Sequence, residues 1–133
     1  MNHRFALYSM VMLKDNHVDL AGGIRQAIEN TKLYLKKGDL HLPMEVETRN
    51  LTEVSEALAV GGIDVIMLDN MSVDDMKTAV NLIDGKCKTE ASGGITESNL
   101  RAVAQCGVDY ISVGALTHSV KSLDLSLKVI KTQ

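Results

Sequence analysis

Short runs rich in apolar residues alternate with longer segments of helical period along most of this chain, and this alternation restricts the fold more than any other sequence feature. The short runs have the length of buried strands, and the longer segments space their apolar residues as on one helix face. Repeated strand-helix units are typical of a parallel sheet covered by helices. The alternation predicts strands at residues 10–13, 44–47, 65–68, 86–90 and 110–113, and helices at residues 20–36, 51–59, 73–83, 97–105 and 122–130.

Capping signals support the predicted helix boundaries. Asn50 is followed three residues later by Glu53, and Ser72 is followed at the same spacing by Asp75. At this spacing a side-chain oxygen at the helix start and an acid three residues on satisfy the first free amides. Glycine in a left-handed conformation is a common helix stop. The sequence places such residues after three of the predicted helices, at Gly61, Gly85 and Gly107.

The number of predicted strands is too small for a closed α/β barrel. The chain has 133 residues, 45% of them apolar, which is enough for one substantial core but not for two domains. A closed eight-stranded barrel typically needs about 250 residues. We therefore expect an α/β fold, a partial (β/α) barrel of about five parallel strands. Because open strand edges are normally covered, we expect the sequence to be truncated from a longer chain or completed by another chain.

The composition argues against nucleic acid and membranes as partners. The formal net charge is −3, and no run of Lys or Arg stands out. With three Tyr, one Phe and no Trp, the chain lacks a stacking platform for single-stranded nucleic acid. The apolar runs are too short to span a bilayer, and the amino terminus does not resemble a signal peptide. Cys87 and Cys106 are isolated thiols, which suit packing in a reducing compartment. These features predict a cytoplasmic location.

Polar residues follow each predicted strand. In a parallel α/β sheet all strands point the same way, so the residues that follow them gather at the carboxyl-end face, where such folds bind ligands. The five clusters are Lys14-Asp15-Asn16-His17, Glu47-Thr48, Asp69-Asn70, Ser92-Gly93-Gly94 and Gly114-Ala115-Leu116. The sequence therefore predicts a functional site at this face.

Two glycine-bearing segments, residues 90–96 and 112–118, follow the last two predicted strands and precede predicted helices. Glycines there let backbone amides approach an anion, and a helix amino terminus adds favourable partial charge. Either segment alone can be a tight connection without a ligand. Together they predict phosphate binding, because paired turns after late strands form the usual phosphate site of α/β barrels. His118 is placed to touch such a phosphate.

Glu47 and Asp69 end adjacent predicted strands, so their carboxylates can converge. Mg²⁺ prefers a few carboxylates together with substrate phosphate oxygens, and ribose hydroxyls are alternative partners. The competing interpretation is that each residue caps the following helix. Glu45 alternates with Glu47 and shares its face, so spacing alone does not separate the two.

His3, Arg4 and Lys14 form a small basic group around the first predicted strand. An Arg fork beside His or Lys suits a ligand that bears carboxylates. The alternative is that these side chains are solvated near the terminus. His17 and His41 are interpreted as structural or exposed.

Several strings in this chain occur in the same order in one family. They are Asn2-His3-Arg4, Leu13-Lys14-Asp15-Asn16-His17, Ala21-Gly22-Gly23-Ile24, Glu45-Val46-Glu47, Met67-Leu68-Asp69-Asn70-Met71, Glu90-Ala91-Ser92-Gly93-Gly94-Ile95 and the segment from Tyr110 to Ser119. On these strings the chain resembles the quinolinate phosphoribosyltransferases, or nicotinate-nucleotide pyrophosphorylases. The resemblance runs from Asn2 to the last predicted helix.

The resemblance implies a reaction in NAD biosynthesis. The ring nitrogen of quinolinate attacks ribose C1 of phosphoribosyl pyrophosphate as pyrophosphate leaves, and loss of carbon dioxide gives nicotinate mononucleotide. His3, Arg4 and Lys14 resemble the residues that hold the two quinolinate carboxylates. Glu47 and Asp69 resemble the acids on the ribose and Mg²⁺ side, and with Lys14 they are the implied catalytic residues. The implied phosphate cradle comprises Ser92, Gly93, Gly94, Gly114, Ala115, Leu116 and His118.

The family also implies what this chain lacks. Its members have an amino-terminal domain and early barrel strands, and one basic residue comes from the partner subunit of a dimer. We therefore expect residues 1–133 to be the C-terminal half of a TIM-like barrel, to form a homodimer or larger assembly, and to be inactive alone. Two alternatives remain: a non-catalytic phosphate-binding half-barrel or scaffold, and a barrel enzyme acting on a sugar phosphate. The latter gives no reason for the basic group beside Asp69.

Overall fold

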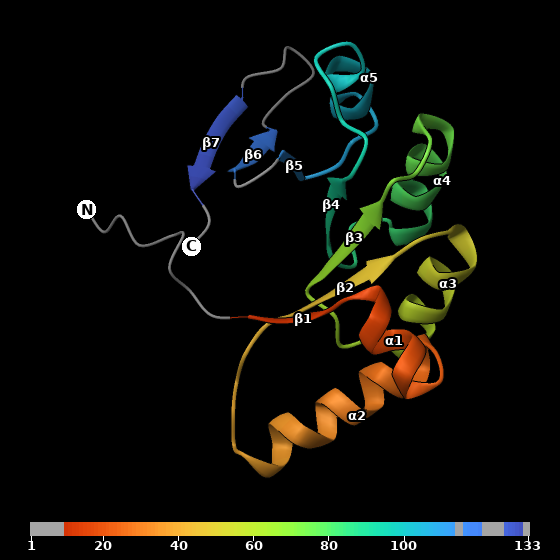
Figure 1. Cartoon of the computed structure of the whole chain (residues 1–133), viewed down its shortest axis with the longest axis vertical. Helices are drawn as coiled ribbons and strands as arrows, with labels where there is room; N and C mark the ends of the chain where they lie inside the picture. Colours follow the sequence, from red (N-terminus) through yellow and green to blue (C-terminus); the bar gives the residue numbers. More distant parts are fainter. Residues whose placement is uncertain (1–9, 114–115, 121–126, 132–133) are drawn as a thin grey trace.

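The computed structural model of the chain describes residues 10–113, 116–120 and 127–131. Strands and helices alternate through the first four-fifths of this region (Figure 1). The strands are β1 (Val11–Leu13), β2 (Met44–Thr48), β3 (Val65–Asp69), β4 (Lys88–Ser92), β5 (Tyr110–Val113), β6 (Leu116–Val120) and β7 (Leu127–Lys131). The helices are α1 (Asp15–Ala21), α2 (Ile24–Lys37), α3 (Leu51–Val60), α4 (Val73–Ile83) and α5 (Leu100–Ala104).

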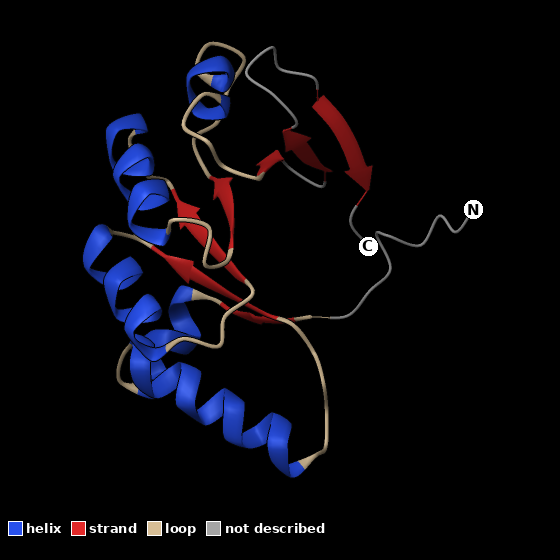
Figure 2. Ribbon diagram, turned by 180° about the vertical axis from the view of Figure 1, so that it is seen from behind, coloured by secondary structure: helices blue, strands red, loops and turns tan. Residues whose placement is uncertain are grey.

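The strands form one sheet in sequence order, and β1 to β5 are parallel. All the helices lie on one side of these strands, as both views show (Figures 1 and 2). The predicted α/β fold with about five parallel strands is confirmed, and the architecture is that of a partial (β/α) barrel. None of the described helices is both long and apolar enough to cross a bilayer.

The hydrophobic core fills the space between the sheet and the helices. Alternate residues of the parallel strands face this layer, and Val46, Ile66, Leu68, Ala91 and Ile111 are fully buried there. Each Val, Leu or Ile side chain among them contributes roughly 1.5–3 kcal/mol when buried. The helices supply the opposite side of the core with Val18, Ile24, Ile28, Val54, Met76, Ala79, Ile83 and Val103.

A glycine pair divides the first predicted helix in two. The sequence predicted one helix over residues 20–36, but α1 begins earlier, at Asp15, and ends at Ala21. Gly22 and Gly23 follow with φ values of 100° and 134°, which L side chains rarely adopt. The amide of Gly23 bonds back to the carbonyl of Val18 (2.9 Å), which closes α1 before α2 starts.

The predicted amino-terminal caps of α3 and α4 are confirmed. The side chain of Asn50 accepts a hydrogen bond from the amide of Glu53 (2.9 Å), and Ser72 accepts one from Asp75 (3.1 Å). The Glu53 carboxylate bonds to the amide of Arg49 (2.7 Å), one residue before the cap. At the other ends, Gly61 caps α3 as predicted, but Asp84 in a left-handed conformation caps α4 in place of Gly85, and Gln105 caps α5 in place of Gly107.

Two predicted boundaries shift because turns occupy residues assigned to strand or helix. Strand β4 begins at Lys88 and not at Lys86, since the Lys86 amide bonds to the carbonyl of Ile83 (3.0 Å) and prolongs the turn after α4. Helix α5 is shorter than the predicted 97–105. The side chain of Asn99 accepts from the Thr96 amide (2.8 Å) and donates to the Gly94 carbonyl (2.9 Å), which holds the preceding residues in a turn.

The predicted final helix, residues 122–130, is wrong for the part that the structure describes. Leu127–Lys131 forms β7, which pairs antiparallel with β6, and β6 pairs antiparallel with β5. Residues 121–126 lie outside the described residues. The returning strands cover the edge of β5 that no sixth parallel strand occupies, and unpaired edges are normally covered. Val129 and Ile130 are β-branched residues, which favour strands.

Two aspartates fasten the amino ends of the strands. The Asp64 carboxylate accepts from the amide of Met44, where β2 begins (2.8 Å), and Asp109 accepts in the same way from Thr89 at the start of β4 (2.9 Å). In return the amides of Asp64 and Asp109 donate to the carbonyls of Met44 and Thr89 (2.9 and 3.0 Å). We call these two contacts the aspartate clasps. They fix the register that brings the opposite strand ends together.

Candidate functional site at the carboxyl ends of the strands

The sheet face away from the helices, the inner face, carries polar side chains in registered rows. Residues paired across parallel strands share a face, because side chains alternate along each strand. One row comprises Glu47, Met67, Glu90 and Tyr110, and the next row toward the carboxyl ends comprises Asp69, Ser92 and Ser112. The row on the amino side comprises Met12, Glu45, Val65 and Lys88. The acids of neighbouring strands are thereby concentrated on one surface.

Glu47 is tied to the turn that follows β1. Its Oε1 accepts a hydrogen bond from the backbone amide of Asp15 (2.8 Å), in the first turn of α1. The preceding residue, Lys14, is exposed and stands at the end of β1, where its amide bonds to Nδ1 of the exposed His17 (3.5 Å). The bond from Asp15 fixes one carboxylate oxygen of Glu47 against the turn that begins after Lys14.

The glycine turn after β4 lies against the turn after β3. The amide of Asn70 donates to the carbonyl of Ser92 (2.7 Å). Gly93 and Gly94 both have positive φ, 80° and 68°. A Cβ at Gly93 would meet Asp69 Oδ1 and the Asn70 amide nitrogen at 3.1 Å, and a Cβ at Gly94 would meet Asn70 Oδ1 at 2.8 Å. Glycine is required here because the Asp69 carboxylate and the turn occupy adjoining space.

Glu45 and Glu47 have different environments. Glu45 is 4% exposed, whereas Glu47 is half-buried and nearer the carboxyl ends of the strands. Burial, a hydrogen bond with Glu90 and the charges of Glu90 and Glu47 raise the pKa of Glu45 to about 9. As a carboxylate its Oε2 would be buried without a partner, while the protonated acid donates to Glu90. Of the two acids that spacing does not separate, Glu47 is therefore the more accessible and the nearer to the carboxyl-end face.

Glu47 and Asp69 fit a site for a hydrated divalent cation. They lie on the same face of neighbouring strands, and both are half-buried. Within residues 10–113 and the two later strands, no three His, Cys, Asp or Glu side chains gather as a closed metal cage. Mg²⁺ commonly uses one or two protein carboxylates together with water and phosphate oxygens, so a pair of acids suits it.

The structure brings together six of the predicted site residues and leaves the others apart or undescribed. The six, at the ends of β1 to β4, are Lys14, Glu47, Asp69, Ser92, Gly93 and Gly94. His3, Arg4, Gly114 and Ala115 lie outside the described residues. The backbones of Leu116 and His118 belong to β6 and pair with Val113 and Ile111. The second glycine segment therefore leads into a strand and not into the predicted helix.

Two inner-face residues were missed by the sequence reasoning. Ser112 Oγ donates a hydrogen bond to Glu90 Oε2, which links β5 to β4. The available signal was the period-two alternation from Glu90 to Ser92, which places both on one face. The interaction of Glu90 with Glu45 on β2 is not predictable from local sequence patterns, because the two residues are far apart in sequence and β3 lies between their strands.

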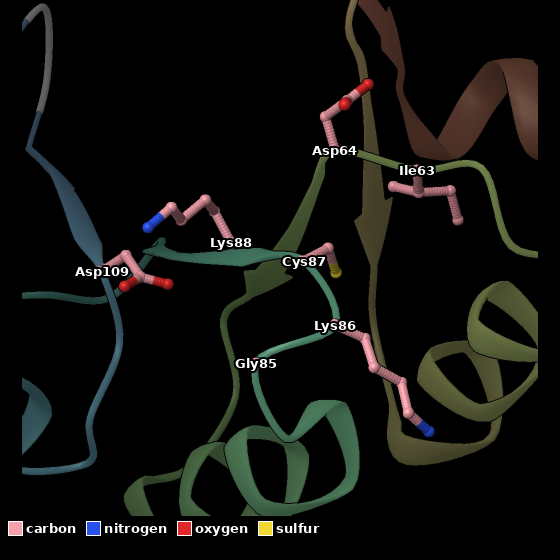
Figure 3. A pocket seen from close by; sticks show the side chains of 7 residues that line it. All are labelled: Ile63, Asp64, Gly85, Lys86, Cys87, Lys88 and Asp109. Atoms are coloured by element: carbon pink, nitrogen blue, oxygen red, sulfur yellow. The ribbon is translucent and has the colours of Figure 1, made fainter.

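A cavity of about 320 Å³ lies at the opposite ends of the strands and is not this site. Asp64 and Asp109 line it, but their carboxylates already form the aspartate clasps. Figure 3 shows Lys86 and Lys88 extending in different directions, so their ammonium groups do not converge on one ligand. Ile63, Gly85 and the half-buried Cys87 complete the lining, and burial raises the pKa of the Cys87 thiol.

The parallel sheet, its one-sided helices and the acids and glycine turn at the carboxyl strand ends define an α/β-barrel protein with its ligand site at that face. A family model described as "Quinolinate phosphoribosyl transferase, C-terminal domain" matches residues 1–128. This chain belongs to the quinolinate phosphoribosyltransferase family.

Relatives with known names agree with this assignment. A chloroplastic nicotinate-nucleotide pyrophosphorylase [carboxylating] of Arabidopsis thaliana is 47% identical, over 96% of this chain and 41% of the relative. A probable nicotinate-nucleotide pyrophosphorylase [carboxylating] of Synechocystis sp. is 45% identical, over 98% of this chain and 44% of the relative. The chain thus spans about two-fifths of the length of the relatives that it matches.

Solved structures of nicotinate-nucleotide pyrophosphorylases share the fold. The enzyme from Ehrlichia chaffeensis is 34% identical with a TM-score of 0.73, covering 94% of this chain and 41% of that chain. The enzyme from Francisella tularensis is 38% identical with a TM-score of 0.71, covering 94% of this chain and 40% of that chain. The predicted correspondence to the TIM-like barrel of this family is confirmed.

Proposed function

We propose that this chain carries the C-terminal part of an active site that transfers a phosphoribosyl group from phosphoribosyl pyrophosphate to quinolinate. The products are nicotinate mononucleotide, pyrophosphate and carbon dioxide. The observation that carries the proposal is the contact between Asp69 and the glycine turn, because it places a carboxylate for ribose or metal beside amides for phosphate. Family membership supplies the substrates, and the name of a tobacco relative, a quinolinate phosphoribosyltransferase, agrees with them.

Glu47 and Asp69 hold the ribose side of the donor in this proposal. Their carboxylates accept hydrogen bonds from ribose hydroxyls and are the ligands that would hold Mg²⁺. When bound, the metal ion supplies positive charge that favours departure of pyrophosphate. The bond from Asp15 holds one oxygen of Glu47, so the carboxylate is oriented before the substrate arrives. Both acids also tolerate the positive charge that develops at ribose C1.

Ser92, Gly93 and Gly94 form one half of the phosphate cradle. The positive φ values expose their backbone to a ligand, and the absence of Cβ atoms permits close approach. We assign the other half to Gly114, Ala115, Leu116 and His118 on the family resemblance. For Leu116 and His118, the support is that β6 pairs with β5, which neighbours the strand that carries Ser92.

Lys14 binds a quinolinate carboxylate in this proposal, and His3 and Arg4 contribute to the same group. The exposed Lys14 lies at the end of β1, next to the residue whose amide contacts Glu47. We propose on this basis that the acceptor pocket lies beside the ribose acids, as attack by the ring nitrogen on C1 requires. The bond from C1 to pyrophosphate breaks as the bond to nitrogen forms. Subsequent loss of carbon dioxide leaves an electron pair on the ring carbon, which the quaternised ring nitrogen stabilises, and this carbon then takes up a proton from solvent.

The rest of the site is proposed to come from elsewhere. Because the chain spans about two-fifths of its relatives, we propose that residues 1–133 are the C-terminal portion of the catalytic barrel and are inactive alone. We further propose Mg²⁺ as cofactor and assembly as a homodimer or larger oligomer. A cytoplasmic location is proposed from the sequence features alone, and the plant relatives carry chloroplastic and mitochondrial names.

A chimera tests the proposal. This chain replaces the matched portion of the Synechocystis relative, and formation of nicotinate mononucleotide is measured with quinolinate, phosphoribosyl pyrophosphate and Mg²⁺. We expect product from the chimera, none from this chain alone, and none from a chimera with Asp69→Asn. Product from the isolated chain would contradict the proposed incompleteness. A folded chimera that binds pyrophosphate without turnover would favour a non-catalytic phosphate-binding scaffold.

A further inference from the structure

Glu90 is a half-buried acid of the inner face that joins three strands. It lies in β4 on the inner face, in register with Met67 on one side and Tyr110 on the other. Its Oε2 accepts a hydrogen bond from Ser112 Oγ in β5. The carboxyl of Glu45, from β2, forms a hydrogen bond with Glu90 across the intervening β3.

The bond from Ser112 lies directly beneath the predicted phosphate cradle. Ser112 is in register with Ser92, the first residue of the glycine turn after β4. Glu90 precedes Ser92 by two residues on the same face, so its carboxylate reaches sideways to β5 below the turn. Besides the backbone pairing, this side-chain bond connects β4 and β5 toward their carboxyl ends, whereas the Asp109 clasp connects them at their amino ends.

We propose that Glu90 is a positioning residue, which through Ser112 fixes the separation of the β4 and β5 ends so that both can hold one pyrophosphate group. The inference rests on the proposed function for its substrate. Glu90 itself does not touch the ligand. Its carboxylate accepts from Ser112 on one side and is held by Glu45 on the other, so its rotamer is locked from two directions.

The chemistry of the two contacts predicts which substitutions are tolerated. A glutamine at this position retains an oxygen that accepts from Ser112 and gains an amide that donates to Glu45, so both links remain. Alanine removes both and leaves the Ser112 hydroxyl and the buried Glu45 without this partner. Misplacement of a binding group by a small distance weakens binding without removing any contact residue.

The test compares Glu90→Ala, Glu90→Gln and Ser112→Ala in the Synechocystis chimera, with Glu56→Ala on the exposed side of α3 as the matched control for loss of a carboxylate. Glu90→Ala is expected to raise the KM for phosphoribosyl pyrophosphate about tenfold, the effect of losing one charged hydrogen bond. In the same variant the KM for quinolinate is expected to stay within about twofold of the wild-type value. In Glu90→Gln the KM values for both substrates are expected to stay within about twofold of wild type. Ser112→Ala should also raise the KM for phosphoribosyl pyrophosphate. The double variant, Glu90→Ala with Ser112→Ala, should raise this KM no further than Glu90→Ala alone.

Binding of inorganic pyrophosphate by calorimetry supplies a readout that does not depend on turnover. It is measured for the chain itself and for the chimera, and circular dichroism checks folding of each variant. Tenfold weaker binding in Glu90→Ala with normal binding in Glu90→Gln supports the positioning role, even if the chimera makes no product and the proposed function fails. The positioning role is overturned if Glu90→Ala binds pyrophosphate as tightly as the wild type. It is also overturned if Glu90→Ala raises the KM for both substrates equally, or if neither the wild-type chain nor the wild-type chimera binds pyrophosphate.

Discussion

The backbone amide of Asp15 donates a 2.8 Å hydrogen bond to Oε1 of Glu47, and this contact joins the turn after β1 to the end of β2. One oxygen of the acid therefore has a structural partner. The other remains for a ligand at the carboxyl-end face. A single side chain thus combines a role in loop geometry with a proposed role in substrate binding, and substitutions can separate the two.

Glu47→Gln is expected to separate charge from structure. The amide oxygen still accepts from Asp15, so the free energy of unfolding should change by less than about 0.5 kcal/mol. In the chimera, loss of the charge should lower kcat/KM for phosphoribosyl pyrophosphate by about a hundredfold or more. Glu47→Ala should show the same kinetic loss and about 1 kcal/mol of destabilisation as well. Urea unfolding and steady-state kinetics measure both. An active Glu47→Gln chimera would remove Glu47 from the proposed site.

Gly93→Ala is expected to damage the turn through two effects. The positive φ strains any L side chain by about 1–2 kcal/mol, and the new Cβ presses on Asp69 Oδ1 and the Asn70 amide. Gly85→Ala is the matched control, because Gly85 has a similar φ of 74° and no atom within 4 Å of the added Cβ. Both variants should lose stability, but only Gly93→Ala should weaken pyrophosphate binding, as measured by calorimetry. Equal binding in the two variants would place the phosphate elsewhere.

Stability is expected to depend on pH through Glu45. Its pKa is about 9 in the folded chain against an ordinary value of 4.5, so between these values the folded chain holds a proton that the unfolded chain releases. This contribution to stability is complete below the lower value and declines as the pH rises toward 9. Glu45→Gln keeps a donor to Glu90 without a titrating proton.

The measurement is urea unfolding of wild type and Glu45→Gln across this pH range. The difference between the two isolates Glu45 together with its interaction with Glu90 and Glu47, since more distant groups titrate alike in both. Stability of the wild type should fall relative to Glu45→Gln as the pH rises, and the variant should be the more stable protein at about pH 8. Parallel profiles would show that Glu45 is ionised in the folded chain.

Asp109→Ala is expected to open one aspartate clasp. Thr89 is 3% exposed, and its amide and hydroxyl both bond to the Asp109 carboxylate, at 2.9 and 3.2 Å. Their loss should cost about 1–3 kcal/mol, the range for a buried polar group left unpaired. Asp109→Asn retains one acceptor oxygen and should recover most of that loss in urea unfolding. If Asp109→Ala unfolds like the wild type, water or another group replaces the clasp.

Much of the fold was accessible from the sequence because its signals are local. Buried runs such as Val65–Asp69 are rich in apolar residues, and caps such as Ser72 sit three residues from their partners. The errors occurred where local signals were given too little weight. From Leu123 to Val129 apolar residues alternate with polar ones, a period of two that favours a strand, and Leu127–Lys131 forms β7. The break at Gly22 was visible as a glycine pair, yet its weight against the helical period of its neighbours was underestimated.

The candidate site was predictable in its outline and not in its connections. Strand direction alone places Glu47, Asp69 and Ser92 at one face. The links between these elements depend on side-chain reach across strands, as in the bond between Ser112 and Glu90. One further signal was present in the sequence and overlooked: Gly62-Ile63-Asp64 and Gly107-Val108-Asp109 repeat a pattern of glycine, aliphatic residue and aspartate before β3 and β5. Both aspartates form clasps.

The clasps also bear on how such a chain can change over time or by engineering. Each one locks its strand to an earlier strand at the end remote from the proposed chemistry, so the register does not depend on the turns beyond Asp69 or Ser92. Those turns can then vary in length and sequence while the strands that bear them stay aligned. A new loop grafted at that end would inherit a scaffold that is already in register, and the substrate range of the barrel could be redesigned without redesigning its sheet.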